Sequence, residues 1–110
     1  MDERSVVITG ASTGIGAAAA LHLDELGWRV FAGVRREQDG DRLRKEAGDR
    51  LTPVRLDVTD AASLTAAASE VEAATGAAGL QGVVCNAGIA RAGPIELIDL
   101  DELRHQFEVN

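Results

Sequence analysis

The sequence predicts an α/β fold in which helices flank a doubly wound parallel sheet. Short apolar runs rich in β-forming residues alternate with segments of helical periodicity, and the connections between them are short. The first run, Val6–Ile8, is β-branched and uninterrupted, as in strands that are buried on both faces of a parallel sheet. It leads through Gly10, Gly14 and Gly16 into an alanine-rich helix. This order implies parallel strands joined by right-handed crossovers.

The chain between the glycine turn and residue 57 is predicted to form a helix, a strand, a short charged helix and another strand. Gly27 and Gly48 supply the stop signals of the two helices. The first of the two strands is rich in β-formers, and the second tolerates Pro53 because that residue lies near a strand end. The four elements are expected at Ala17–Leu26, Trp28–Val34, Asp41–Ala47 and Leu51–Asp57.

A third helix and a fourth strand follow. Thr59 or Asp60 is expected to cap this helix, and Gly76 ends it. The strand is expected at Gly79–Asn86. The apolar residues that recur at helical spacing are Leu64, Ala67, Ala68, Val71 and Ala74.

A final helix is expected after a loop that contains Gly93-Pro94. Asp99 and Glu102 stand three residues apart, like a capping box at its start. No glycine, proline or basic turn ends it at Phe107–Asn110. We therefore expect residues 1–110 to be the N-terminal part of a larger domain.

Length, charge and cysteine usage limit the class of protein. A chain of 110 residues holds one small domain or part of a larger one. Its formal net charge of −7 argues against a nucleic-acid surface, which needs a basic face. No apolar run approaches the ~18 residues of a membrane span, so no membrane contact is expected. Cys85 is the only cysteine, which favours a cytoplasmic protein in which Cys85 is a small buried residue.

A strand, a glycine turn and a helix N-terminus together form an anion-binding site. Backbone N–H groups point outward there, and the helix dipole favours a phosphate. Glycine permits a positive φ in the turn and lets a pyrophosphate approach the backbone closely. Gly10, Gly14 and Gly16 therefore predict a nucleotide site, and a surface turn that is merely rich in glycine is the alternative. No metal site is expected, because nothing marks His22 or His105 as a ligand.

The end of the second strand indicates which dinucleotide binds. About 20 residues past the glycine turn, a carboxylate would accept hydrogen bonds from the ribose of NAD. Val34-Arg35-Arg36 stand there instead, and a guanidinium matches a 2′-phosphate in charge and in forked donor geometry. We expect NADP rather than NAD, with Arg35 on the phosphate and Arg36 as a solvated loop charge.

These residues resemble the short-chain dehydrogenase/reductase family. The turn has the family's T-G-x-x-x-G-x-G spacing over Thr9–Gly16, and Asn86-Ala87-Gly88 follows on the fourth strand. Val34-Arg35, Leu56-Asp57-Val58 and Val84–Ile89 look most like the NADP-linked branch that contains 17β-hydroxysteroid and retinol dehydrogenases. The resemblance runs through all 110 residues and implies an incomplete Rossmann-type NAD(P)-binding domain. This part of the domain would run from the first strand to the start of the helix that follows the fourth strand.

The resemblance also implies cofactor roles for residues at the strand ends. The glycine turn would surround the phosphates, and Ser12 with Arg35 would hold the 2′-phosphate. Asp57 and Val58 would meet the adenine ring, with a turn aspartate as the alternative for Asp57. Asn86 would both lie beside the ribose and stabilise the sheet. The implied cofactor-binding residues are Gly10, Ser12, Thr13, Gly14, Ile15, Gly16, Arg35, Asp57, Val58, Asn86, Ala87 and Gly88.

The resemblance places Asn110 in the family's catalytic tetrad, where it would hold a water of the proton relay at a break in the helix. A solvated helix asparagine is the alternative. The sequence has no tyrosine, and its single lysine, Lys45, lies in the second crossover, so the tetrad's Tyr-x-x-x-Lys is missing. Because a carbonyl reduction needs an acid to protonate the developing alkoxide, we expect the 110 residues alone to be inactive.

Three functions are compatible with these observations. The first is the cofactor-binding part of an NADP-dependent oxidoreductase that acts on a small alcohol or carbonyl substrate and is a homo-oligomer when complete. The second is a half-length protein that binds NAD(P) without catalysis, as a sensor or remnant. The unfinished last helix and the uncovered sheet edge argue against it. The third, an epimerase or dehydratase, is disfavoured because those proteins use a different glycine pattern.

Overall fold

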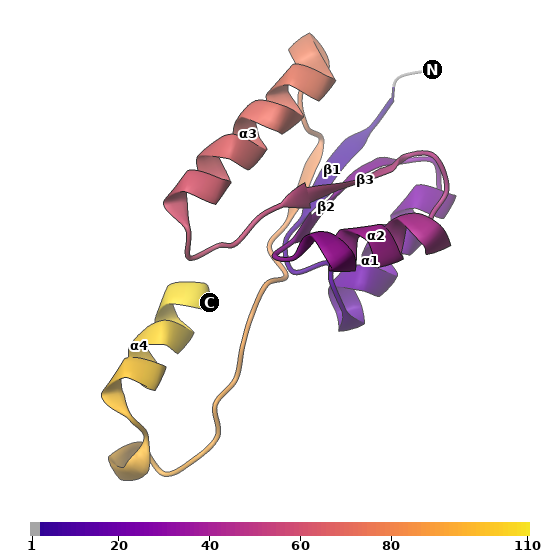
Figure 1. The fold of residues 1–110 in the computed structure, drawn as a ribbon. Coiled ribbons are helices and arrows are strands. Elements are labelled where there is room, and N and C mark those ends of the chain that lie inside the picture. The colour runs from indigo at the N-terminus through magenta and orange to yellow at the C-terminus, as the bar shows by residue number, and fades with distance from the viewer. Residues whose placement is uncertain (1–2) are drawn as a thin grey trace.

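A computed structural model describes residues 3–110 and contains one sheet of four parallel strands (Figure 1). Across the sheet the order is β3-β2-β1-β4, so the connections turn back at β1. The strands are β1 (Ser5–Ile8), β2 (Arg29–Val34), β3 (Leu51–Arg55) and β4 (Gly82–Val84). The helices are α1 (Gly14–Glu25), α2 (Glu37–Glu46), α3 (Ala61–Thr75) and α4 (Leu100–Val109).

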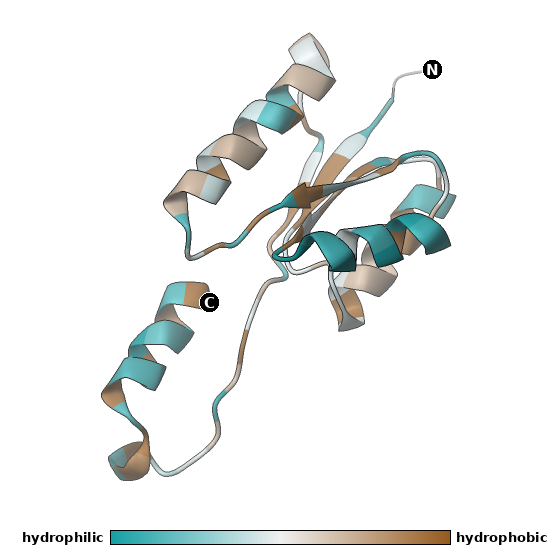
Figure 2. Cartoon of the chain, in the orientation of Figure 1, coloured by the Kyte–Doolittle hydropathy of each residue, from teal (hydrophilic) through white to brown (hydrophobic). Residues whose placement is uncertain are grey.

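Two apolar layers confirm the predicted doubly wound arrangement. Successive side chains of a strand point to opposite faces, so Val6 and Ile8 pack toward α1 and α2. Val7 and Phe31 pack toward α3. Figure 2 shows the brown, hydrophobic strands between these helices, with α2 teal along its visible side. The first layer is Val6, Ile8, Ala11, Ala20, Val30, Ala32, Val34, Leu43 and Leu51, and the second is Phe31, Val54, Leu56, Ala67 and Val71.

Aspartates cap the two later helices, as the sequence predicts. The Asp60 carboxylate accepts hydrogen bonds from the backbone N–H groups of Ala62, at 3.1 Å, and Ser63, at 3.4 Å. Asp60 is thus the cap of α3, rather than Thr59. Asp99 accepts from the N–H of Asp101 at 3.0 Å. A capping box would need the Asp99 carboxylate to accept from the N–H of Glu102, and the Glu102 side chain to accept from the N–H of Asp99. Neither bond forms within residues 3–110, so Asp99 caps α4 but the predicted capping box is absent.

Several predicted boundaries are wrong by a few residues. α1 begins at Gly14 rather than Ala17, and α2 begins at Glu37 rather than Asp41. Glu37 and Asp39 lie in the first turn of α2, where negative charge is favoured by the helix dipole. Strand β3 ends at Arg55, and β4 shrinks to Gly82–Val84. Only these three residues of β4 pair with β1.

Strands β3 and β4 form the edges of the sheet. Pro53 lies in the middle of β3 and is tolerated because a proline on an edge strand can turn its missing donor outward. At the other edge Val83 is 59% exposed, as expected for an uncovered edge. Cys85 is exposed as well, so the prediction of a buried cysteine is wrong. No helix formed by the described part of the chain is long and apolar enough to cross a membrane.

Helix α4 extends away from the sheet on a long connection (Figure 1). Hydrogen bonds tie the C-terminal half of this helix and Asn110 to that connection. The Asn110 side chain accepts from the N–H of Ile89 at 2.9 Å and donates to the carbonyl of Ile89 at 3.0 Å. Gln106 accepts from the N–H of Arg91 at 3.1 Å. The last turns of α4 are thereby held next to the residues that follow β4.

Candidate functional site

A cavity of about 340 Å³ lies where the four strands end, at the point where the strand order reverses between β1 and β4. The residues that follow each strand contribute to the cavity, because the carboxyl ends of parallel strands all lie at the same end of the sheet. Ligands of open α/β sheets bind in the crevice at this edge. The cavity therefore occupies the place where the sequence predicts a dinucleotide.

Most of the predicted cofactor-binding residues line this cavity, and only Gly14 and Gly16 do not. Gly14 has φ of +59° at the start of α1. A Cβ atom on Gly16 would lie 2.5 Å from Asn86 Nδ2 and would overlap the carbonyl oxygen of Gly10. These two glycines therefore allow the backbone conformation and the close packing of the turn without lining the cavity themselves. Those that line the cavity are Gly10, Ser12, Thr13, Ile15, Arg35, Asp57, Val58, Asn86, Ala87 and Gly88.

Asn86 joins the end of β4 to the glycine turn. Its side-chain amide donates to the carbonyl oxygens of Thr9, at 3.2 Å, and Gly10, at 3.1 Å. The Thr9 hydroxyl accepts in return from the N–H groups of Asn86 and Ala87, both at 2.9 Å. Gly10 has φ of +64°, and a Cβ there would lie 2.8 Å from Ala87 Cα. The structural role that the sequence predicts for Asn86 is thus present.

Helix α1 begins at the cavity without a cap. Thr13 is extended at the N-cap position, and its side chain makes no capping hydrogen bond. The first turn of α1 contains no acidic residue, in contrast to α2 with Glu37 and Asp39. The first N–H groups of a helix have no acceptor within the helix. At α1 they remain free to bind an anion in the cavity.

Arg35 and Asp57 bring opposite charges to the cavity. Asp57 Oδ1 accepts from the Thr59 hydroxyl at 2.7 Å and from the Thr59 N–H at 2.9 Å. These hydrogen bonds lower the pKa of Asp57, and the positive charges of Arg35 and Arg55 lower it further. Asp57 therefore closes a turn, as its alternative interpretation predicts, and also faces the cavity.

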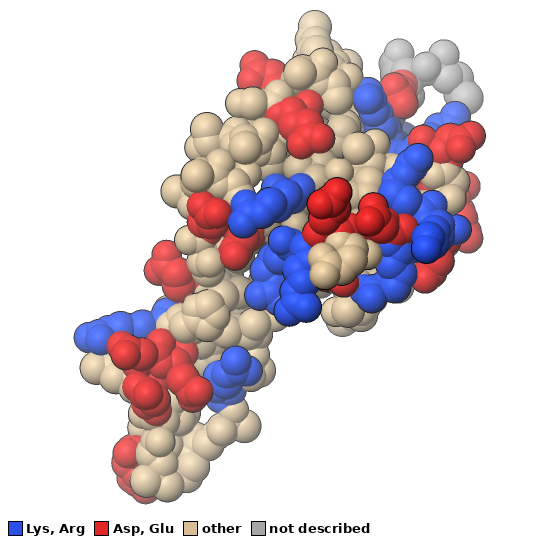
Figure 3. Space-filling view, in the orientation of Figure 1, with Lys and Arg blue, Asp and Glu red and all other residues tan. Residues whose placement is uncertain are grey.

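Arg36, the residue next to Arg35, lies outside the cavity. Arg36 is exposed at the N-cap of α2 and does not line the cavity, which agrees with a solvated loop charge. Figure 3 shows blue Lys and Arg side chains where the body of the sheet meets the extension that carries α4. The chain is acidic as a whole, and Arg35 is a basic side chain that lines the cavity.

The structure adds lining residues that the sequence did not single out. His105 and Val109 stand four residues apart on one side of α4 and face the cavity. No sequence signal could show this, because it depends on where α4 lies relative to the sheet. Asn110 does not line the cavity, and its amide is occupied by Ile89. The added residues are Gly33, Leu56, Thr59, Ile89, His105 and Val109.

The parallel sheet, its reversal at β1 and the glycine turn before an uncapped helix define a Rossmann-type fold. The family model for short chain dehydrogenase matches residues 4–110. The chain belongs to the short-chain dehydrogenase/reductase family, as its motifs predict.

Similar proteins cover the whole chain. It is 40% identical over 111 residues to 17-beta-hydroxysteroid dehydrogenase type 6 of Bos taurus, and 38% identical over 111 residues to retinol dehydrogenase 16 of Mus musculus. These alignments cover 100% of this chain and 35% of each relative. NADPH-dependent 3-dehydrocapnine reductase of Ornithobacterium rhinotracheale is 36% identical over 107 residues, which are 97% of this chain and 38% of the relative. The chain thus spans little more than a third of these relatives' length.

Solved structures share the fold. A short-chain dehydrogenase from Streptomyces avermitilis superimposes with a TM-score of 0.90 at 33% identity, over 99% of this chain and 39% of that one. NADPH-bound carbonyl reductase from chicken fatty liver gives a TM-score of 0.87 at 37% identity, over 100% of this chain and 46% of that one. The arrangement of strands and helices in this chain therefore recurs in part of each of these two structures.

Proposed function

We propose that residues 1–110 are the cofactor-binding part of an NADP-dependent oxidoreductase acting on a hydroxyl/carbonyl substrate. The observation that carries this proposal is the place of Arg35, which lines the cavity at the end of β2 where an NAD-binding protein would have a carboxylate. Two similar proteins bear NADPH in their names, the 3-dehydrocapnine reductase and the chicken carbonyl reductase.

The residues of the cavity fit a dinucleotide. The uncapped start of α1 offers backbone donors to a pyrophosphate, and no carboxylate in its first turn opposes that charge. Ser12 and Arg35 are the groups that would hold a 2′-phosphate. Asp57 Oδ1 already has two donors, so Oδ2 is the oxygen that would accept from the adenine amine. Val58 would cover the ring, and Asn86, Ala87 and Gly88 would lie beside a ribose.

NADPH supplies a hydride when bound, and the protein supplies orientation and a proton. Asn110 would contribute to the proton relay by family resemblance, from a position held by the backbone of Ile89. The Tyr-x-x-x-Lys pair of the family has no counterpart in these 110 residues. We therefore propose that they bind the cofactor without turning it over. Homo-oligomerisation of the complete protein and a cytoplasmic location remain predictions from the sequence.

Replacement of Arg35 tests the choice of cofactor. We expect Arg35→Ala to weaken NADPH binding by about 10- to 100-fold, the value of a hydrogen bond to a charged group. NADH lacks the 2′-phosphate, so its dissociation constant should change by less than a factor of about three. Titration of the protein with both cofactors, followed by their fluorescence, measures the two constants.

The matched control is Arg50→Ala, because Arg50 is exposed before β3 at the opposite end of the sheet. It should leave both constants unchanged. Equal losses of NADPH and NADH affinity in Arg35→Ala would show that Arg35 does not bind the 2′-phosphate.

A cofactor-binding protein without catalysis is the second candidate. The same cavity supports this candidate. The uncovered edge at β4 argues against it, because an exposed edge strand favours aggregation of a separate protein. A protein of native mass 11.5 kDa that is monodisperse and binds NADPH would favour this candidate.

A further inference from the structure

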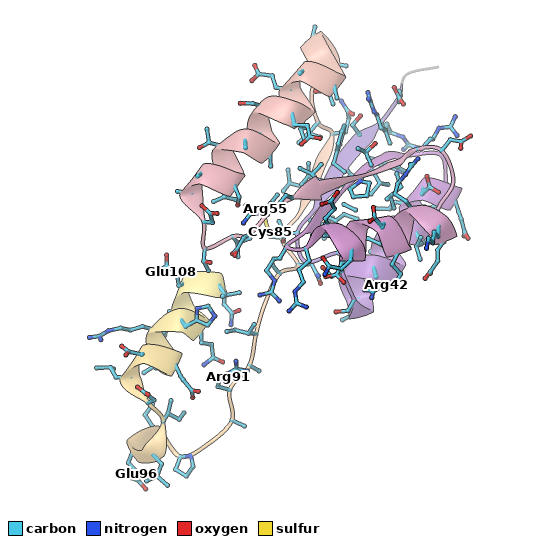
Figure 4. All side chains as sticks on the ribbon, in the orientation of Figure 1. Arg42, Arg55, Cys85, Arg91, Glu96 and Glu108 are labelled. Carbon is cyan, nitrogen blue, oxygen red and sulfur yellow. The ribbon has the colours of Figure 1, made fainter. Side chains whose placement is uncertain are left out.

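Arg42 connects α2 to the glycine turn. Its Nη2 atom donates to the carbonyl oxygen of Ser12 at 2.9 Å, across 30 residues of sequence. The same nitrogen lies 3.2 Å from Asp39 Oδ1. Arg42 is labelled on α2 in Figure 4. One guanidinium thus binds the turn and an acidic residue of its own helix at the same time.

This contact restrains Ser12, which precedes Thr13 at the N-cap of α1. Ser12 lines the cavity, and its carbonyl oxygen is directed to Arg42. Within residues 3–110 the Ser12 hydroxyl makes no hydrogen bond, so it is free for a ligand. A turn rich in glycine has many backbone conformations available to it. A bond to a helix restricts them and keeps the Ser12 side chain beside the cavity.

Arg42 also adds charge to this corner of the molecule. Its side chain is 54% exposed, whereas that of Asp39 is 22% exposed. Nη2 uses its two N–H groups on Ser12 and Asp39, and a guanidinium has five donors. Arg35 lines the cavity, and Arg42 contacts Ser12 from α2. An anion bound by Ser12 would therefore feel two guanidinium groups, one of them partly neutralised by Asp39.

We propose that Arg42 is a positioning residue for the 2′-phosphate of NADPH, acting through the Ser12 carbonyl, and that Asp39 limits its effect. This inference rests on the proposed function. The inference assigns part of the preference for NADPH to α2, although no residue of α2 lines the cavity. The effect should appear as a change in the ratio of NADPH to NADH affinity.

Three variants with different expected results test the inference. Arg42→Met should raise the NADPH dissociation constant about tenfold, because one hydrogen bond and one charge are lost. Arg42→Lys keeps the charge without the fork, and should lie between Arg42→Met and wild type. Asp39→Asn should tighten NADPH about twofold to threefold, since an opposing charge at the protein surface is removed. NADH affinity should change less than about twofold in all three.

The measurement is cofactor titration at low and high salt, with circular dichroism and the melting temperature of each variant. The ratio of NADPH to NADH affinity should fall with salt in wild type and less so in Arg42→Met. Arg50→Met is the control for loss of one positive charge at the far end of the sheet. A gain of affinity in Asp39→Asn could not come from partial unfolding.

The outcomes separate this inference from the proposed function. Equal losses of NADPH and NADH in Arg42→Met would mean that the contact only stabilises the turn, and would overturn the inference. An NADPH constant unchanged in Arg42→Met and Asp39→Asn would overturn it as well, while Arg35→Ala could still confirm NADP binding. If wild-type protein binds neither cofactor, both proposals are wrong.

Discussion

At the scale of single residues, Asp57 combines a structural and a chemical part. Its carboxylate closes a turn by accepting two hydrogen bonds from Thr59 and faces the cavity near Arg35. The bonds and the charge favour the ionised form, so the pKa of Asp57 lies below the ordinary value of an aspartate. An ionised Asp57 can only accept hydrogen bonds, which suits an adenine amine as a partner.

Thr59→Val should raise the pKa of Asp57, because the largest stabilising bond of its charged form is removed. A pKa that is lower in the folded than in the unfolded protein adds stability above the unfolded value of about 4. That stability is lost as the pH falls through the folded pKa. Wild type should therefore exceed Thr59→Val in free energy of unfolding at pH 7, and the difference should shrink below about pH 4.

Carbon NMR of the Asp57 carboxyl group and urea unfolding at both pH values check this. Thr65→Val is the control, since the Thr65 hydroxyl bonds only within α3, to Ala61. An Asp57 pKa that does not move in Thr59→Val would contradict the assignment of the shift to Thr59.

Single residues also show what a sequence can and cannot predict. Residues directly after strands, such as Arg35 and Asp57, could be placed in the cavity because parallel strands end at one edge. His105 could not, since its position depends on the path of the connection between β4 and α4. Cys85, labelled in Figure 4, was expected to be buried for its residue type alone. It is exposed directly after β4, one of the two edge strands.

At the scale of elements, the glycine turn is held together by its contact with the end of β4. Gly16 packs so closely on Gly10 and Asn86 that no side chain fits there. Gly14 has free space around its Cα but a positive φ. The two glycines therefore have different physical reasons for being glycine, one of packing and one of backbone conformation.

We expect Gly16→Ala to lower the free energy of unfolding by about 3 kcal/mol or more, because the backbone must move and the Asn86 bonds are strained. Gly14→Ala should cost only about 1 kcal/mol, the penalty for a left-handed alanine. Urea unfolding of the two variants compares these costs, with Gly27→Ala as a second case of positive φ in open space. Similar losses in Gly14→Ala and Gly16→Ala would contradict the packing argument.

Element types followed from periodicity and from stop signals, and the four strands and four α-helices that the sequence predicts are all present within residues 3–110. The boundaries were less predictable. The segment 37–40 is polar and contains Gly40, so it lacks an apolar pattern, yet it forms the first turn of α2. Gly40 is buried there, and a Cβ atom on it would lie 2.8 Å from Pro53 Cβ. Segment 37–40 therefore packs closely against β3 as part of α2. This contact joins residues that are far apart in the sequence, so the local pattern of residues 37–40 could not predict it.

At the scale of the whole molecule, the proposed function rests on cofactor binding by residues 1–110, without catalysis by them alone. The cavity offers donors for a phosphate, but a carbonyl reduction also needs a positioned acid. We expect no oxidation of NADPH above that of an empty-vector preparation when the 110 residues meet a ketone or an aldehyde. The assay follows absorbance of NADPH at saturating cofactor, with binding confirmed in the same sample. A measurable kcat would contradict the expectation and point to another acid in the cavity.

The extended position of α4 has a consequence for hydrodynamics. The chain measures 55 × 26 × 23 Å, and its radius of gyration of 15.3 Å exceeds the roughly 13 Å of a compact domain of about 100 residues. A molecule of this shape experiences more friction than a sphere of equal mass. It would leave a size-exclusion column early and pass for a heavier particle, even as a single chain. Light scattering, which weighs the particle without regard to its shape, is therefore the measurement from which its subunit number should be read.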